Sequence, residues 1–146
     1  MMEKLDFLES YAAELTREQD LKNALREYKS RAASARSIKL DDMPHGSSGG
    51  RDLSDYVAWC EECVEKIEAQ MHKTDATREI IGHALRGLGD PILYDVLYYR
   101  HIAGMSMSRI AQKMYVARRH VYRLYDKAFE QLDITEDAPR LEQLAA

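Results

Sequence analysis

Apolar residues recur along the first quarter of the chain at spacings of three and four, the period of one helix face. The stripe begins at Leu5, shifts by one residue near its middle and continues to Ala35 without an intervening Gly or Pro. This pattern predicts one long helix over residues 3–37, with a narrow seam of the coiled-coil kind. Its predicted seam residues are Leu5, Leu8, Ala12, Leu15, Leu21, Leu25, Tyr28, Ala32 and Ala35.

A second stripe alternates spacings of four and three without a slip and predicts a helix over residues 53–88. Pro, Gly and Ser accumulate between the stripes, which predicts a loop over residues 38–52, with Asp52 or Ser54 as the following helix cap. A break near Thr74 and Asp75 is compatible with the pattern, because these residues can cap a new helix. The predicted seam is Leu53, Val57, Cys60, Val64, Ile67, Met71, Thr74, Arg78, Ile81, Leu85 and Leu88.

The two long helices have matching lengths, so the loop predicts an antiparallel hairpin over residues 1–88. Gly87 and Gly89 suit the end of its second helix, and Pro91 suits the first turn of the next. That third helix, of about 12 residues, stops at Gly104. A short helix capped by Ser106 and then a longer one over residues 117–132 follow, and together with the third helix they form a predicted DNA-binding domain of residues 89–133. The acidic residues 134–146 are predicted to form a frayed tail. No strand pattern is present, so the predicted fold class is all-α.

The last two of these helices match the packing frame of a helix-turn-helix, which needs a small residue where the helices cross and apolar anchors at fixed offsets. Ala111 takes the small fifth position of the frame. The turn then spans residues 114–117. The apolar fourth, eighth, tenth, fifteenth and eighteenth positions are filled by Ile110, Met114, Val116, Val121 and Leu124.

Two residues of this turn depart from the usual frame. Tyr115 stands where the frame has a glycine in the left-handed backbone conformation, which costs about 1 kcal/mol. Ala117 stands at the cap of the second helix and forfeits a side-chain bond of about 1 kcal/mol. Both are local deficits in stability that core contacts can offset.

The distribution of charge along the chain is more informative about function than the net charge of −4. Between Tyr99 and Lys127 there are seven Lys or Arg residues and one Asp, whereas residues 1–98 carry 13 basic and 19 acidic side chains. One basic segment therefore lies between acidic flanks, on the helices that match the frame. This coincidence favours DNA binding over the alternative of a solvated basic helix.

In a helix-turn-helix, the start and outward face of the second helix enter the major groove, and arginine can donate two parallel bonds to guanine. The predicted base contacts are Arg118, Arg119, Tyr122 and Arg123. Other polar residues of both helices can meet phosphates, which positions the protein without specifying a sequence. The predicted phosphate contacts are Ser106, Ser108, Arg109, Lys113, His120 and Lys127.

Other classes of function find little support. No catalytic triad, phosphate loop or complete set of metal ligands is present, so we expect no enzyme, cofactor or metal. Cys60 and Cys63 form a CxxC that suits half a zinc site or a redox pair, but helix residues at this spacing need no special function. No window approaches a membrane span, and the amphipathic N-terminus is not a signal peptide, so a cytoplasmic protein is expected.

The segment from Tyr99 to Leu132 resembles region 4 of bacterial sigma factors. More closely, it is similar to small phage regulators of late transcription, the RinA/ArpU-like group. The resemblance is carried by Tyr99-Arg100, Gly104-Met105-Ser106, Ile110-Ala111 and the run Arg118 to Tyr122. Residues 40–57 also look like a connecting element of these proteins, and the resemblance is weaker over residues 1–37. Arg109 and Ala117 depart from the family's pattern, which has an acid and often a serine there. The resemblance implies a sigma region 4-like module in a bacterial host cell.

The expected function is a sequence-specific transcriptional regulator, a phage late-gene activator that binds double-stranded DNA and acts with host RNA polymerase. An alternative is a DNA-packaging protein of the small terminase kind or another assembly protein, which also joins a helix-turn-helix to an oligomerising helical region. A third is a protein-interaction module whose basic helix binds an acidic partner. The hairpin can mediate formation of a homodimer, or its two helices can bury their apolar stripes against each other within one chain.

Overall fold

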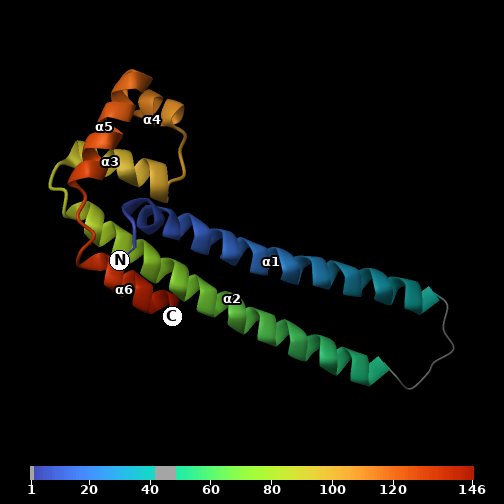
Figure 1. The fold of residues 1–146 in the computed structure, drawn as a ribbon. Coiled ribbons are helices and arrows are strands. Elements are labelled where there is room, and N and C mark those ends of the chain that lie inside the picture. Colours follow the sequence, from blue (N-terminus) through green and yellow to red (C-terminus); the bar gives the residue numbers. More distant parts are fainter. Residues whose placement is uncertain (1, 42–48) are drawn as a thin grey trace. The chain divides into compact units, whose positions relative to one another are not determined.

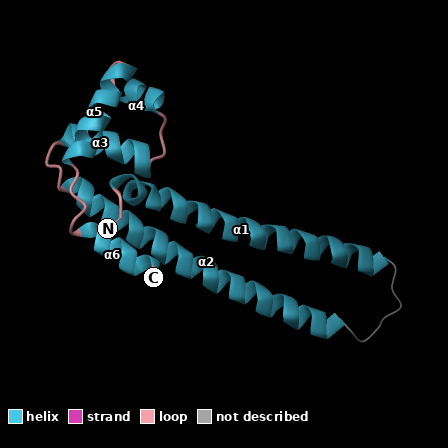
Figure 2. Cartoon of the chain, viewed as in Figure 1, coloured by secondary structure: helices cyan, strands magenta, loops and turns pink. Residues whose placement is uncertain are grey.

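The computed structural model describes the backbone of residues 2–41 and 49–146 and the side chains of residues 2–34 and 53–146. The described residues form helices and no strand (Figure 2). None of these helices is both long enough and apolar enough to cross a membrane. The elements are α1 (Lys4–Asp41), α2 (Gly49–Arg86), α3 (Pro91–Leu97), the π-helical turn η1 (Tyr98–Ile102), α4 (Met107–Met114), α5 (Arg118–Gln131) and α6 (Asp137–Ala145).

The antiparallel hairpin of α1 and α2 is confirmed, and shorter helices follow it (Figure 1). Its boundaries differ from the predicted ones. α1 continues to Asp41 and α2 already begins at Gly49, so the predicted loop over residues 38–52 is too long; residues 42–48 lie outside the described residues. Asp52 and Ser54 consequently lie inside α2 and do not cap it. A helix that has nucleated gains one backbone bond for each residue added, which favours such extension.

α2 is one continuous helix, because it runs through Thr74 and Asp75 without a break. Contacts divide the chain into two compact units, and the division falls inside both long helices. The first unit, here the module, combines residues 1–15 with residues 73–146, and the second, here the arm, comprises residues 16–72. The predicted segments, in contrast, meet at residue 88.

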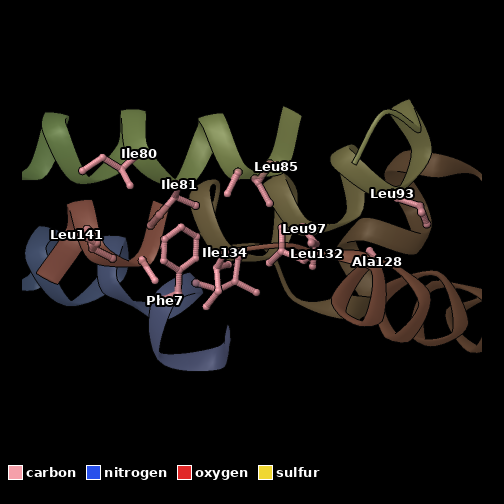
Figure 3. Packing of buried hydrophobic residues seen from close by; sticks show 13 residues of the cluster. Phe7, Ile80, Ile81, Leu85, Leu93, Leu97, Ala128, Leu132, Ile134 and Leu141 are labelled. Atoms are coloured by element: carbon pink, nitrogen blue, oxygen red, sulfur yellow. The ribbon is translucent and has the colours of Figure 1, made fainter. Parts of the chain in front are cut away.

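The module contains a continuous apolar core to which α1, α2, α3, α5 and α6 contribute (Figure 3). Phe7 of α1, Ile81 and Leu85 of α2 and Leu97 of α3 are fully buried. Each such side chain contributes about 1.5–3 kcal/mol by leaving water. The remaining buried members are Leu8, Ile80, Ala84, Leu93, Ala128, Leu132, Ile134, Ala138 and Leu141.

The segment expected to be a frayed acidic tail is instead part of this core. Ile134 precedes α6, and Ala138 and Leu141 lie within it, and all three are buried. The carboxylate of the buried Asp137 lies 2.9 Å from Nδ1 of His83 and 3.2 Å from a guanidinium nitrogen of Arg140. The buried apolar residues recur at helical spacing, but the acidic composition of the segment concealed this signal.

The buried positions of α1 also differ from the predicted seam. Leu5 is 44% exposed and Ala12 is exposed, whereas Glu14 and Glu18 are buried. Glu14 lies 3.8 Å from the ammonium group of Lys73, and Glu18 lies 3.3 Å from that of Lys22. The predicted phase shift does not exist, since the two glutamates fill the seam. Spacings of four and three continue through Phe7, Tyr11, Glu14, Glu18, Leu21, Leu25, Tyr28 and Ala32.

On α2 every second predicted seam position from Val57 to Arg78 is wrong by one residue, whereas Leu85 is buried as predicted. Ile67, Thr74 and Ile81 are buried as predicted, but Val57, Val64, Met71 and Arg78 are exposed. The residue before each takes its place, and one residue corresponds to a rotation of about 100° around the helix. The replacing residues are Tyr56, Cys63, Gln70 and Thr77, all buried or half-buried. The more apolar of two adjacent stripes is therefore the one that faces outward.

Candidate nucleic-acid interface

The candidate interface begins with the segment that precedes α4. Asp90 caps α3 by accepting a hydrogen bond of 2.9 Å from the backbone N–H of Ile92, and Pro91 occupies the first helical position, as predicted. The predicted helix of 12 residues is divided, because the turn η1 widens to a bond from the Ala103 N–H to the Tyr98 carbonyl. This wider turn places the neighbouring residues Tyr98 and Tyr99 against two different apolar clusters.

α4 and α5 are joined by residues 115–117, so the turn is one residue shorter than the predicted one over residues 114–117, because Met114 still belongs to α4. Ser106 caps α4, since its hydroxyl oxygen accepts a hydrogen bond from the Arg109 N–H at 3.2 Å. Tyr115 has φ 57 and ψ 42, which confirms the left-handed conformation predicted for it. Ala117 is the cap of α5 and provides no side-chain bond to the helix.

The residues that define the packing frame come together in a second apolar cluster. Val96 of α3, Ile110 and Ala111 of α4 and Val121 of α5 are its buried members. Met114, Val116 and Leu124 pack against them, so every predicted anchor of the frame is in the cluster. A buried small residue such as Ala111 lets α4 and α5 approach closely, and this packing determines which face of α5 remains outside.

That outer face carries the predicted base-contacting residues. Arg118, Arg119, Tyr122 and Arg123 are all exposed. Their positions follow the pattern i, i+1, i+4 and i+5, which places them on one side of the helix. The guanidinium of Arg118 lies 5.7 Å from the centre of the Tyr122 ring and donates a hydrogen bond of 3.3 Å to its hydroxyl oxygen. This contact gives the guanidinium of Arg118 a preferred orientation at the first turn of α5.

The predicted phosphate contacts are exposed as well. Some of them also make contacts within the protein. They are Ser106, Ser108, Arg109, Lys113, His120 and Lys127. The ammonium group of Lys113 lies 4.9 Å from the centre of the Tyr99 ring. Ser106 accepts the capping bond of α4 with its oxygen, and its hydroxyl hydrogen can still be donated to a phosphate.

Two residues outside the predicted site have a part in this region. Arg100 donates a hydrogen bond of 3.0 Å to the Met105 carbonyl and so holds the loop that leads into α4. Tyr99 provides the ring beneath Lys113. Arg100 belongs to the basic segment and could have been selected by charge. The function of Tyr99 depends on the wider turn η1, which the sequence pattern does not predict.

His101 lies behind this surface and is half-buried. Its Nε2 lies 2.9 Å from the hydroxyl oxygen of Tyr125 on α5. Burial, with a smaller contribution from the charge of Arg100, lowers the pKa of His101 to about 4. The imidazole is therefore neutral at physiological pH, and it joins η1 to α5 without adding charge to the basic segment.

Among the described residues, no group of three or more His, Cys, Asp or Glu side chains is placed to hold a metal ion. Cys60 and Cys63 are free thiols on α2 and are half-buried in the arm. In comparisons of the chain with family models, curated proteins and solved structures, no match is found.

Proposed function

We propose that this protein binds double-stranded DNA through the exposed basic face of α4 and α5 and regulates transcription in a bacterial host. One observation carries the proposal: the residues of the packing frame are buried together, and the cationic side chains lie on the face of α5 that this packing leaves outside. In a helix-turn-helix that face and the start of the second helix enter the major groove.

The arrangement suits the two kinds of contact that such a protein needs. Arg118, Arg119 and Arg123 can donate paired hydrogen bonds to base edges, with Tyr122 beside them. Lys113 and Arg109 lie on α4 and can meet the phosphate backbone, which sets orientation. The regulatory role, and action with RNA polymerase in late phage transcription, rest on the resemblance of residues 99–132 to sigma region 4 and the RinA/ArpU-like group.

The proposal is tested by titrating the protein against a mixed-sequence DNA duplex over a series of salt concentrations. Binding at low salt is expected, with a logarithmic salt slope that corresponds to several phosphate contacts. Replacing Arg119 and Arg123 together by Ala should weaken binding by at least about tenfold, because each removed contact is worth roughly 1 kcal/mol or more. Arg31→Ala is the matched control, as Arg31 is an exposed arginine of the arm.

Equal loss of affinity in the control, or no complex at low salt, would contradict the proposal. If the double variant binds DNA as tightly as the parent protein does, the interface lies elsewhere. Footprinting on the DNA of the genome that encodes the protein would then identify the target, since base contacts must give protection at discrete sites.

A further inference from the structure

The arm exposes a row of large apolar side chains along α2. Leu53, Val57, Val64 and Met71 are 47%, 44%, 40% and 41% exposed. They recur at spacings of four and seven residues. Together with the half-buried Cys60 and the buried Ile67, which also belong to the covered seam, they follow the alternation of four and three that is typical of a coiled coil. The helix therefore has two adjacent apolar stripes, and α1 covers only one of them.

The uncovered stripe lines a groove within the arm. Val57, Cys60 and Val64 form its apolar part, with Lys29 of α1 on one side and Glu61 and Glu65 of α2 on the other. A continuous apolar stripe with a polar rim is the composition of an interface between proteins.

The charges along the two edges of this face have opposite signs. The α1 edge carries Lys22, Arg26 and Lys29, which follow one another at spacings of four and three. On the α2 edge the same spacings connect acidic residues, namely Glu61, Glu65 and Glu68. One face of the hairpin is consequently basic along one helix and acidic along the other.

This charge pattern determines which symmetric arrangement of two copies of the hairpin is favourable. If two such faces meet with the two-fold axis across the helices, α2 lies on α2 and α1 on α1, and like charges oppose each other. If the axis is parallel to the helices, α1 of each copy lies on α2 of the other, and every basic edge meets an acidic edge. Only the second arrangement is self-complementary in charge.

The positions of the charged residues along the helix axes agree with this arrangement. In the arm the rings of Tyr28 and Trp59 are tilted against each other with their centres 3.8 Å apart, so residues of α1 and α2 whose numbers add up to about 87 lie side by side. Rotation about a two-fold axis parallel to the helices does not change the position of a residue along the helix axis. Arg26 of one copy is then level with Glu61 of the other.

We propose that this face of the arm binds a second copy of the chain, with α1 of each protomer packed on α2 of its partner and the loop ends of both arms at the same end. The stripe from Leu53 to Met71 is about 27 Å long, and two helices together are about 20 Å wide. Each copy thus offers roughly 500 Å², which is near the lower limit for a specific complex. A monomer–dimer equilibrium that depends on concentration is expected.

The first test is sedimentation equilibrium of the full chain over a range of concentrations. The parent protein should approach twice the monomer mass. Val64→Glu should remain a monomer while its helical circular dichroism and melting temperature stay unchanged, since Val64 is partly exposed within one chain. A parent protein that stays monomeric at every concentration, or a mass well above the dimer, would overturn the proposal.

The second test exchanges the charges. One variant carries Glu61→Lys and Glu65→Lys, and the other carries Arg26→Glu and Lys29→Glu. Each alone should dimerise at least about tenfold more weakly than the parent, and a mixture of the two should recover a heterodimer. Arg31→Glu with Lys66→Glu is the matched control, since it reverses two charges elsewhere on the arm and should dimerise like the parent.

Recovery in the mixture distinguishes a specific interface from a general effect of charge or folding. If both charge variants dimerise as well as the parent, or if their mixture stays monomeric while each is folded, the arrangement is wrong. The dimer is independent of the proposed DNA binding, because its residues lie in the arm and the DNA-binding residues lie in the module.

Discussion

The module and the arm use the same two long helices, yet they bury their side chains to very different extents. In the module Phe7, Leu8, Ile81 and Leu85 are fully excluded from solvent. In the arm Ile67 is the most buried apolar side chain among those described, and it keeps 9% of its surface. Two helices alone can cover only the strip between them, whereas a third layer closes a core.

The difference also shows what each region tolerates in its seam. The arm accepts Cys63 and Gln70 at half-buried seam positions, and its buried Glu18 lies beside Lys22. In the module Glu14 occupies a seam position beside Lys73, and the buried Asp137 is held by His83 and Arg140. In both regions a buried carboxylate is thus accompanied by a basic side chain.

The comparison predicts a large difference between two truncations at seam positions. Ile81→Ala in the module should lower the free energy of unfolding by about 3–4 kcal/mol, because it leaves a cavity in a closed core. Leu25→Ala in the arm should cost about 1 kcal/mol, since Leu25 is half-exposed and water can fill the space. Urea unfolding followed by circular dichroism measures both. Equal losses of unfolding free energy in the two variants would show that another surface covers the arm in solution.

A smaller effect concerns the half-buried His101 of the module. Its pKa is lowered in the folded protein, so below pH 6.5 the unfolded chain takes up a proton that the folded chain does not bind. Stability should therefore fall as the pH decreases from about 6.5 toward 4, by about 1 kcal/mol at pH 5 once partial solvent exposure is discounted. Melting curves between pH 7.5 and 5 measure this dependence.

His101→Gln should flatten that pH dependence, because glutamine does not titrate. His72→Gln is the matched control, as His72 is exposed on the arm, and it should leave the dependence as it is in the parent. A parent protein whose stability is constant over this range would show that burial of His101 has no energetic consequence.

The smallest expected effect lies at the turn of the module. Gly104 has φ +71 and Tyr115 has φ 57, so a tyrosine occupies a conformation that the same region elsewhere assigns to glycine. The Tyr115 side chain is 94% exposed and contributes little packing. Tyr115→Gly should therefore raise the free energy of unfolding by about 0.5–1 kcal/mol.

Tyr115→Ala is the control for this change, because it removes the ring but retains the Cβ that strains the backbone. It should not stabilise the protein. If both replacements lower the melting temperature in differential scanning calorimetry, the tyrosine ring makes a stabilising contact that outweighs the strain of the turn.

Much of the candidate interface could be predicted from the sequence, since its signals are local. The packing frame around Ala111 uses offsets within two short helices, and the left-handed turn at Tyr115 follows from that frame. The exposure of Arg118, Arg119, Tyr122 and Arg123 follows in turn, because helical periodicity places them opposite Val121 and Leu124. The turn η1 could not be predicted, since the apolar pattern of residues 91–102 is equally compatible with one continuous α-helix.

The sequence by itself determined that the chain is helical, approximately where α4 and α5 begin and end, and which face of α5 is basic. These properties depend on neighbours three or four residues away. Only the tertiary structure decided which of two apolar stripes on α2 is covered, that Glu14 and Glu18 are buried, and that α6 belongs to the core. Those outcomes depend on partners far along the chain. A stripe of apolar residues shows that a face can be buried, but the segment that covers it determines whether it is.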